Sequence, residues 1–560
     1  MNPSARDRQK GFTRLRNLLI VVALLAMALA GAASRVTPKP AMVAIPDTGG
    51  TYLEAAVGNP SYLNPVLLQF NQVDRDITSL IFSGLTRFDD TGHLVPDLAQ
   101  SWDIGDGGKS YLFHLRHDVR WQDQTPFTAD DVVFTVKAMQ DKSFQGSQDV
   151  AALWRAVDVQ QVDDYTVRFT LKEPFAPFLE YTTVGILPHH LYANATGKAM
   201  TDSPYNLKPI GTGPFKLTDI SSEGVTLEPN TDYYGPAPHL SQIQFRFYAD
   251  YPSALAALQK GEVDGLPYLA SQDVAALSTD TKLQIYSAPD YLKYSVLFLN
   301  NSNPLFKDKA VRQAVSYAID RDKIIQTVLS GQGLPGKGPI SPGSWAFDPK
   351  AGNYQYDPQK AAALLDAAGW RDNNGDGIRE KDGAALSFVI LTNDNPQRIK
   401  IGESVAEDLR KVGFKTEVQA AAWSDLLKDY LNPRTYVGFL TEQWLLTADP
   451  DVYSLWDSSQ IGNGGSNFAG ISNPRIDRLL EEARGTVDKT QRQQLYSQFQ
   501  SLWADEAPSV ILYYPKFNWA VSQKIKGVNL SYMVDGSSRF RDVSGWYVKT
   551  KMVPQDGTKK

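Results

Sequence analysis

Short β-rich runs alternate with amphipathic helices from Gly50 onward, and no internal repeat or low-complexity block interrupts them. In YLFHLRHDVRW, which begins at Tyr111, apolar and polar side chains alternate as they do along a half-buried strand. In FTADDVVFTVKAMQ, Thr128 stands where it can cap a helix whose first turn carries two aspartates. The alternation predicts a mixed α/β fold.

The pattern changes near Pro289. The strand-like run YSVLFLN is followed by PLFKDKAVRQAVSYAIDRDKIIQTVLSG, in which Asp320 is placed to cap a second helix. Further along, Asn473 precedes a proline and an apolar helical face in NPRIDRLLEEAR, which predicts another capped helix. Two α/β blocks that divide near Leu292 are the natural interpretation.

Length and composition limit the class of protein. With 560 residues, of which 42% are hydrophobic and 21% charged, the chain is too long for one core, so we expect two or three domains. A formal net charge of -6 leaves no basic surface for nucleic acid. The count of 0 cysteines excludes disulfides, thiolate metal sites and cysteine nucleophiles.

Residues 1–34 have the pattern of an export signal. Basic residues precede an uncharged apolar run from Leu18 to Ala33, which ends in small residues. The run is slightly shorter than the ~20 residues of a comfortable membrane span, so a cleaved signal peptide and an uncleaved membrane anchor both fit. We expect a flexible linker over residues 35–49 and a body that works in the periplasm or on the outer face of the cytoplasmic membrane.

The chain carries no recognisable catalytic constellation. Its 6 histidines form no H-E-x-x-H pair, and no serine lies in a G-x-S-x-G elbow. The run GQGLPGKG, from Gly331, satisfies G-x-G-x-x-G, but a helix precedes it, whereas a phosphate loop needs a strand before it and a helix after it. We interpret this run as a helix end that leads into an irregular loop, and we expect no enzyme.

The run DNNGDGIREKDG resembles a calcium-binding loop. Asp372, Asn374, Asp376 and Gly377 occupy positions one, three, five and six of that pattern. Position twelve holds Gly383 instead of a bidentate glutamate, so calcium affinity should be weak. A structural calcium and a Gly-rich polar turn both remain open, and no cofactor is required.

The segment QWLLTADPDVYSLWDSSQ, residues 443–460, gathers aromatic surface and negative charge. Asp449 and Asp451 flank a proline, and Trp444, Tyr453 and Trp456 lie around them in the sequence. These residues are candidates for a ligand site. The same residues also suit a helix that Asp449 caps, with Tyr453 and Trp456 in the core. Both interpretations remain open.

Several separated segments follow one another in a recognisable order. They begin with LAQSWDIGDGGKSYLFHLRHDVRWQDQTPFTADDVVFTV and continue with GTGPFKL, DYYGPAPHL, ALQKGEVDG, KAVRQAVSYAIDR, LLDAAGW and SNFAGISNPRIDRLLEEAR. Together they resemble the family 5 extracellular solute-binding proteins, the oligopeptide and dipeptide receptors of ABC importers, over almost the whole chain after the leader. Asp118, Gln122 and Gln124 stand where relatives often carry Gly, His and Gly.

The resemblance implies an α/β fold of the periplasmic-binding-protein type II kind. Such a fold has two lobes joined by a hinge and three domains, with mixed sheets flanked by helices. The base domain would comprise residues 50–84, 211–291 and 520–550, the inserted domain residues 85–210 and the second lobe residues 292–519, with 551–560 as a tail. The division near Leu292 agrees with the residue pattern, whereas the insertion follows from the resemblance alone.

The resemblance also implies a monomeric receptor that captures oligopeptides between its lobes and delivers them to the transmembrane subunits of an ABC permease. In relatives, an aspartate three residues beyond the tryptophan of this segment pairs with the α-ammonium of the peptide. Here Thr447 holds that position, and the acid–proline pair is shifted to Asp449. We therefore expect Asp449→Asn to weaken free-amine peptides and to spare N-acetylated ones.

Two other functions are compatible with the sequence. Some members of the family bind oligosaccharides, and Trp423, Trp444 or Trp456 would suit the stacking of sugar rings. A secreted hydrolase is the alternative from another class, against which the missing nucleophile–base pair weighs. Nickel or haem uptake also occurs in the family, but no histidine cluster supports it here.

Overall fold

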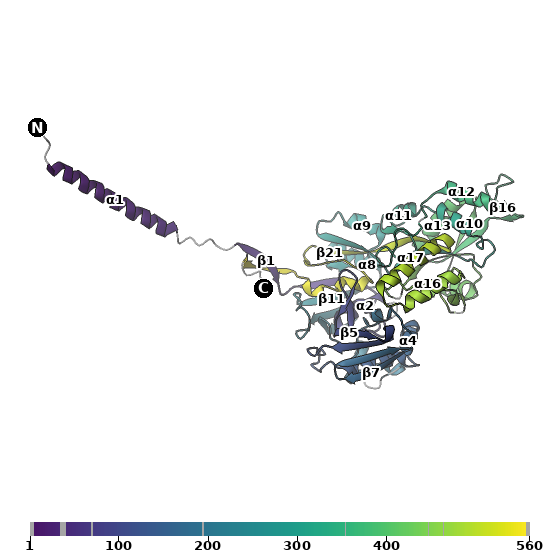
Figure 1. The fold of residues 1–560 in the computed structure, drawn as a ribbon, viewed down its shortest axis with the longest axis horizontal. Helices are drawn as coiled ribbons and strands as arrows, with labels where there is room; N and C mark the ends of the chain where they lie inside the picture. Colours follow the sequence, from purple (N-terminus) through teal and green to yellow (C-terminus); the bar gives the residue numbers. More distant parts are fainter. Residues whose placement is uncertain are drawn as a thin grey trace. The chain divides into compact units, whose positions relative to one another are not determined.

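The computed structural model describes residues 5–33, 41–68, 71–192, 195, 197–352, 354–445, 447–462 and 464–555 (Figure 1). The chain divides into two compact units, one made of residues 1–47 with 549–560 and the other of residues 48–548.

The smaller unit contains a long helix and a two-stranded ribbon. Helix α1 (Ala5–Ala33) includes an exposed window, Gly11–Ala30, with a mean hydropathy of 1.8, which is long and apolar enough to cross a membrane. Strand β1 (Met42–Asp47) pairs antiparallel with β22 (Lys549–Pro554). The predictions of a flexible linker and of a tail are therefore wrong for residues 42–47 and 551–554, while residues 35–40 and 556–560 lie outside the described part.

One long strand of the larger unit, β21 (Ser509–Ser522), belongs to both lobes. Residues 509–513 pair antiparallel with β14 (Lys293–Leu299), and residues 516–522 pair with β13 (Leu283–Pro289). Where the two connections meet, the backbone N–H of Asp290 donates to the carbonyl of Pro515 at 2.9 Å. The chain thus crosses between the lobes at two adjacent points, which is the arrangement that a hinge needs. The predicted boundary at residue 519 lies inside β21.

The sheet of the first lobe is assembled from distant parts of the chain. The parallel pair of β2 (Thr51–Val57) and β11 (Gln242–Tyr248) lies at its centre. Its other strands are β9 (Phe215–Ile220), β10 (Gly224–Pro229), β12 (Gly265–Leu266), β13 and the end of β21. The helices of this part are α2 (Gln72–Ile81), α8 (Tyr251–Lys260) and α9 (Ser271–Leu277).

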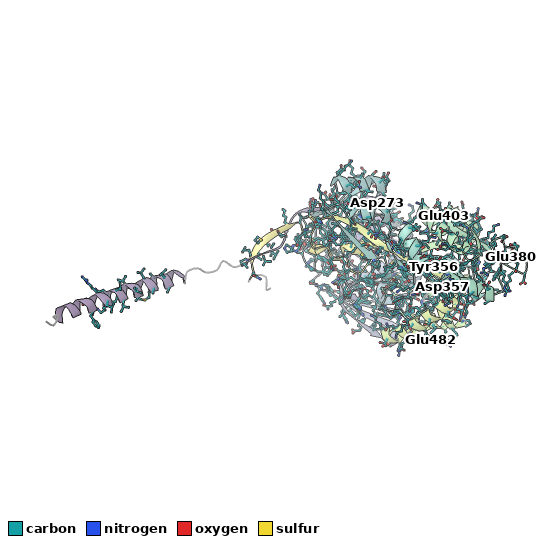
Figure 2. All side chains as sticks on the ribbon, turned by 90° about the horizontal axis from the view of Figure 1, so that it is seen from above. Asp273, Tyr356, Asp357, Glu380, Glu403 and Glu482 are labelled. Atoms are coloured by element: carbon teal, nitrogen blue, oxygen red, sulfur yellow. The ribbon has the colours of Figure 1, made fainter. Side chains whose placement is uncertain are left out.

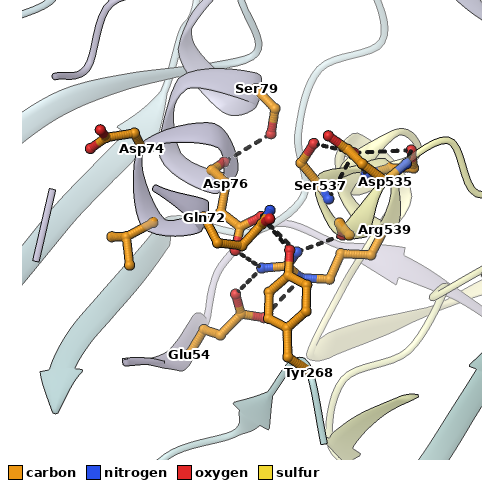
Figure 3. A network of polar contacts seen from close by, with 12 residues as sticks. Glu54, Gln72, Asp74, Asp76, Ser79, Tyr268, Asp535, Ser537 and Arg539 are labelled. Carbon is orange, nitrogen blue, oxygen red and sulfur yellow. Dashed lines mark hydrogen bonds and ion pairs between the residues drawn. The ribbon is translucent and has the colours of Figure 1, made fainter. Parts of the chain in front are cut away.

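A buried ion network joins these distant parts (Figure 3). Arg539 is fully buried, and its guanidinium contacts Glu54 of β2 at 2.5 Å and Asp76 of α2 at 2.8 Å. The hydroxyl of Tyr52 donates to Glu54, and the hydroxyl of Tyr268 donates to Asp76. Because residues near positions 54, 76, 268 and 539 meet here, the network fixes how the base of the first lobe closes on itself.

The inserted domain is a four-stranded antiparallel sheet covered by helices. The strand order is β5 (Ala99–Gly105), β6 (Ser110–Leu115), β8 (Thr166–Leu171) and β7 (Val157–Asp163), and its helices include α3 (Ala129–Gln140), α4 (Gln148–Arg155) and α5 (Phe178–Tyr181). The predicted cap of α3 is confirmed, since Asp131 accepts the backbone N–H of Thr128 at 3.0 Å in a capping box. Asp131 also accepts the indole N–H of buried Trp121, which fixes the helix to the core.

The sheet of the second lobe places three strand ends at one edge. Strand β18 (Ser387–Asn393) runs parallel to both β19 (Lys415–Ala421) and β20 (Gly438–Trp444), so their carboxyl ends lie together. The surrounding helices include α10 (Lys309–Ala318), α11 (Arg321–Thr327), α12 (Pro358–Ala367), α13 (Pro396–Arg410), α16 (Pro474–Gly485) and α17 (Lys489–Glu506). In α/β folds this edge is where ligands usually bind.

Local sequence signals of the second lobe have mixed outcomes. The predicted caps are confirmed, because Asp320 accepts from Lys323 N at 2.9 Å and Asn473 accepts from Arg475 N at 3.0 Å. The expected irregular loop after Gly331 is partly wrong, because β15 (Gly333–Pro335) pairs with β21. Leu334 packs its apolar side chain against a core cluster, which favours a strand here, whereas the neighbouring glycines had indicated a loop.

Candidate ligand-binding site

A cavity of about 1080 Å³ lies between the inserted domain and the second lobe. The inserted domain lines it with α4, residues 171–175 and Tyr181, and the second lobe with the end of β20, the loop before residue 456 and the end of α16. This volume is slightly above the ~300–1,000 Å³ that is usual for small-molecule sites. The cavity therefore suits a ligand larger than a single amino acid.

Trp444 is a half-exposed aromatic wall of this cavity. It ends β20 at the edge of the sheet where the carboxyl ends of β18, β19 and β20 lie together, and 46% of its surface is accessible. Its indole N–H donates to Glu442 at 3.0 Å, and the ammonium of Lys293 lies 4.1 Å from the ring centroid. These contacts fix the ring orientation and leave surface for a ligand.

Asp451 and Tyr453 line the same cavity, as predicted positions for a site, together with Arg484. Asp451 accepts Tyr453 N at 3.2 Å with one oxygen and Arg484 Nε at 2.9 Å with the other. Burial raises the pKa of Asp451, and the nearby guanidinium of Arg484 opposes that shift. The ion pair is thus a built part of the cavity wall. Sequence analysis missed Arg484, because a basic residue in the last turn of a helix is ordinarily a partner of the helix dipole.

Asp449 does not face this cavity, and the predicted ammonium anchor is therefore corrected. Its two oxygens are held by Arg492, at 2.8 Å to Nη1 and 2.6 Å to Nη2, and both side chains are buried. Asp449 borders a separate void of about 20 Å³. It also does not cap a helix as expected, since it accepts Asp451 N in a turn before α15 (Tyr453–Trp456).

The two lobes touch directly beside the cavity. The backbone N–H of Asp449 donates to Glu180 Oε2 of α5 at 2.6 Å, and the N–H of Ala176 donates to the carbonyl of Arg484 at 2.9 Å. Burial, and secondly the charge of Asp449, raise the pKa of Glu180 to about 8. These contacts exist only while the inserted domain lies against the second lobe, so the structure is a closed state.

The two remaining predicted tryptophans lie apart from the cavity. The prediction that Trp456 stacks on a ligand is wrong, because this side chain is 0% exposed and its ring packs edge-on against Trp503, with the ring centroids 5.2 Å apart. Trp423 follows β19 at the same edge of the sheet and is 46% exposed, with its ring centroid 6.3 Å from that of Phe439. Trp423 does not line the large cavity, so a role in binding stays a prediction.

The polar side chains of the acidic turn at residues 372–380 form hydrogen bonds within the turn itself. Both oxygens of Asp372 accept backbone N–H groups, from Gly375 at 2.7 Å and Gly377 at 3.0 Å. The side-chain amide of Asn374 donates to Glu380 at 2.6 Å, and Asp376 accepts Ile378 N at 2.8 Å. Figure 2 places Glu380 at an edge of the larger unit. Within the described residues no three acidic or histidine side chains converge on a metal position, so this geometry fits a polar turn better than a calcium cage.

Two lobes that are linked through β21 and closed over a large cavity define the architecture of a solute receptor. The chain belongs to the bacterial extracellular solute-binding proteins, family 5, whose middle-region model matches residues 93–465. It is 32% identical over 527 residues to the oligopeptide-binding protein AppA of Bacillus subtilis (strain 168), covering 93% of this chain and 96% of that protein.

Solved structures of the same fold carry different ligands. AppA from Bacillus subtilis in complex with a nonapeptide superposes with a TM-score of 0.71 at 30% identity, covering 90% of this chain and 100% of that one. NikZ from Campylobacter jejuni in complex with Ni(L-His) superposes with a TM-score of 0.73 at 28% identity, covering 89% and 99%. These likenesses confirm the predicted family and the two-lobed fold.

Proposed function

We propose that this protein is the extracytoplasmic receptor of an ABC importer, which captures oligopeptides in the interlobe cavity and delivers them to the permease. The observation that carries the proposal is the cavity of about 1080 Å³, which both lobes line with aromatic, apolar and polar side chains. A peptide presents the same mixture of groups, and a roomy cavity admits varied side chains with bridging water. The similarity to an oligopeptide-binding protein supports the same ligand class.

Closure of the hinge supplies the mechanism. A ligand in the cavity contacts both lobes only in the closed state, so its differential affinity shifts the balance from open to closed. The contacts of Glu180 with Asp449 and of Ala176 with Arg484 form in the same step. The permease then recognises the closed shape. No covalent chemistry enters this cycle, and we propose that the protein is not an enzyme.

We place the larger unit outside the cytoplasmic membrane as a monomer. Helix α1 is long and apolar enough to hold the protein at that membrane when it is not cleaved. A tethered receptor stays near the permease, which raises the effective concentration of one partner for the other.

Oligosaccharides are a second candidate ligand. The half-exposed ring of Trp444 in the cavity wall favours them, because an accessible indole face stacks on the apolar face of a sugar ring. A charged pair such as Asp451 with Arg484 in the same wall is better matched by the termini of a peptide.

Calorimetric titration separates these candidates. The full-length protein in detergent, freed of bound ligand by mild denaturation and refolding, would be titrated with a hexapeptide library and then with β-linked oligosaccharides. We expect heat from the peptides, together with a smaller radius of gyration in small-angle scattering. Binding of sugars alone would reassign the ligand, and cleavage of either probe would reopen the hydrolase alternative. Scattering that stays unchanged at saturation would contradict the hinge mechanism.

A further inference from the structure

Arg484 has an unusual position at the end of α16. Its guanidinium carbon lies 4.3 Å from the ring centroid of Tyr453 in the second lobe and 5.1 Å from that of Phe175 in the inserted domain. The side chain is 36% exposed and lines the cavity. Two aromatic rings from opposite lobes therefore hold the guanidinium plane in place when the lobes are closed.

The hydrogen-bonding capacity of Arg484 is only partly used. Its Nε donates to Asp451 at 2.9 Å, and within the described chain neither Nη atom has a hydrogen-bond partner. A guanidinium carries five N–H donors in a planar fork, and the Nη pair matches the two oxygens of a carboxylate. Since Arg484 lines the cavity, its Nη donors are available to a ligand.

The other charges of the cavity leave this role to Arg484. Asp449 is neutralised by Arg492 away from the cavity, and both oxygens of Asp451 are already bonded. The other charged residues that line the cavity are exposed, so water solvates their charges: Asp149, Lys172, Glu173 and Glu481. Arg484 is thus the charged residue of the cavity that is only partly exposed, is held in place by its neighbours and still has free N–H donors.

We infer that Arg484 binds a carboxylate of the ligand, which is the C-terminal carboxylate where the ligand is a peptide. The inference rests on the proposed receptor function and deepens it, because it replaces selection through an α-ammonium by selection through an anionic end. The carbonyl of Arg484 also accepts the N–H of Ala176 across the interface, at 2.9 Å. A carboxylate bound by Arg484 would therefore lie beside the hydrogen bond between Ala176 and Arg484, which connects the two lobes in the closed state.

The test compares free and amidated C-termini. The full-length protein and its Arg484→Gln variant would be titrated with a hexapeptide library that carries free carboxylates and with the same library amidated. We expect the unmodified protein to prefer the free-acid library by ~10-fold or more and Arg484→Gln to lose that preference, while its affinity for the amides changes by less than about twofold.

Matched variants separate binding from folding. Arg478→Gln changes the same charge on the same helix, where Arg478 is exposed and near Glu482, so it should alter neither titration. Arg484→Lys keeps the charge without the fork and should restore part of the preference. Thermal melting of each variant reports whether the fold is retained.

The outcomes distinguish this inference from the proposed function. Equal binding of both libraries by the unmodified protein, or equal losses in Arg484→Gln, would overturn the carboxylate role and leave peptide binding intact. If neither library binds, a uronic-acid oligosaccharide and its neutral counterpart would be titrated in the same way. A preference for the acidic sugar that Arg484→Gln removes would retain the inference and overturn the peptide assignment, and no preference would overturn both.

Discussion

Arg492 donates hydrogen bonds to both carboxylate oxygens of Asp449, from Nη1 at 2.8 Å and from Nη2 at 2.6 Å, in the interior of the second lobe. The same Asp449 gives its backbone N–H to Glu180 of the opposite lobe at 2.6 Å. The sequence suggested that this acid–proline turn anchors a ligand. The structure instead gives it a structural role: the ion pair with Arg492 fixes its conformation, and its backbone N–H binds the opposite lobe.

Arg492→Met should destabilise the protein strongly. Removing the guanidinium leaves Asp449 buried without its partner, which typically costs ~3–5 kcal/mol of unfolding free energy. Urea unfolding would measure the loss, and Lys309→Met, which breaks an exposed pair with Asp505, should leave the midpoint nearly unchanged.

The ligand specificity of Asp449→Asn also tests whether Asp449 has a structural role. Since Asp449 does not face the cavity, we expect free-amine and N-acetylated peptides to be affected equally. A loss confined to the free-amine peptides would restore the ammonium role that the sequence pattern predicted.

Closure should weaken as the pH rises, through Glu180. Its pKa is raised from 4.5 to about 8 in the closed state, mainly by burial and next by Asp449. The closed state therefore holds a proton that a solvated Glu180 releases. Its stabilising effect is complete below about pH 4.5 and is lost as the pH rises through about 8. Arg492 and Tyr532 also face this group.

Glu180→Gln tests this dependence. The amide oxygen still accepts Asp449 N, but nothing titrates, so ligand affinity should vary less between pH 5 and 8.5 than in the unmodified protein. Titrations across that range would measure the difference. Identical pH profiles for the two proteins would show that Glu180 does not control closure.

The sequence predicted what local chemistry determines. Asp320 and Asn473 cap their helices because an acceptor side chain serves N–H groups two or three residues ahead. The orientation of Asp449, in contrast, depends on Arg492, 43 residues further along the chain, and no local pattern specifies that pairing. Arg484 becomes a cavity residue only because Phe175 of the other lobe lies over it. The fold followed from the family resemblance, and the site required the tertiary contacts.

The buried network of the first lobe should be more sensitive than any surface pair. Arg539→Met leaves Glu54 and Asp76 without the guanidinium that both contact, so we expect a loss of ~3–5 kcal/mol in unfolding free energy at pH 7. Burial already raises the pKa of Glu54, so a lone Glu54 binds a proton more readily than in the unfolded chain. The deficit should therefore shrink as the pH falls from 7 towards 5.

Urea unfolding at both pH values would check this expectation. Lys198→Met, at an exposed pair with Asp202, should not change stability at either pH. A deficit that does not change with pH would mean that lost packing of Arg539, rather than the uncompensated carboxylates, dominates.

Calcium should leave the stability of this protein unchanged. At residues 372–380 the carboxylates of Asp372 and Asp376 accept backbone N–H groups, and Asn374 directs its amide N–H toward Glu380. Gly383 supplies no oxygen at the position where a calcium loop has its bidentate glutamate. Calorimetric melting in millimolar calcium and in chelator should thus give midpoints within ~1 °C, because a ligand stabilises only the state that it binds. Asp372→Asn should weaken the turn equally in both buffers, whereas a rise of several degrees in calcium that this variant abolishes would establish a metal site.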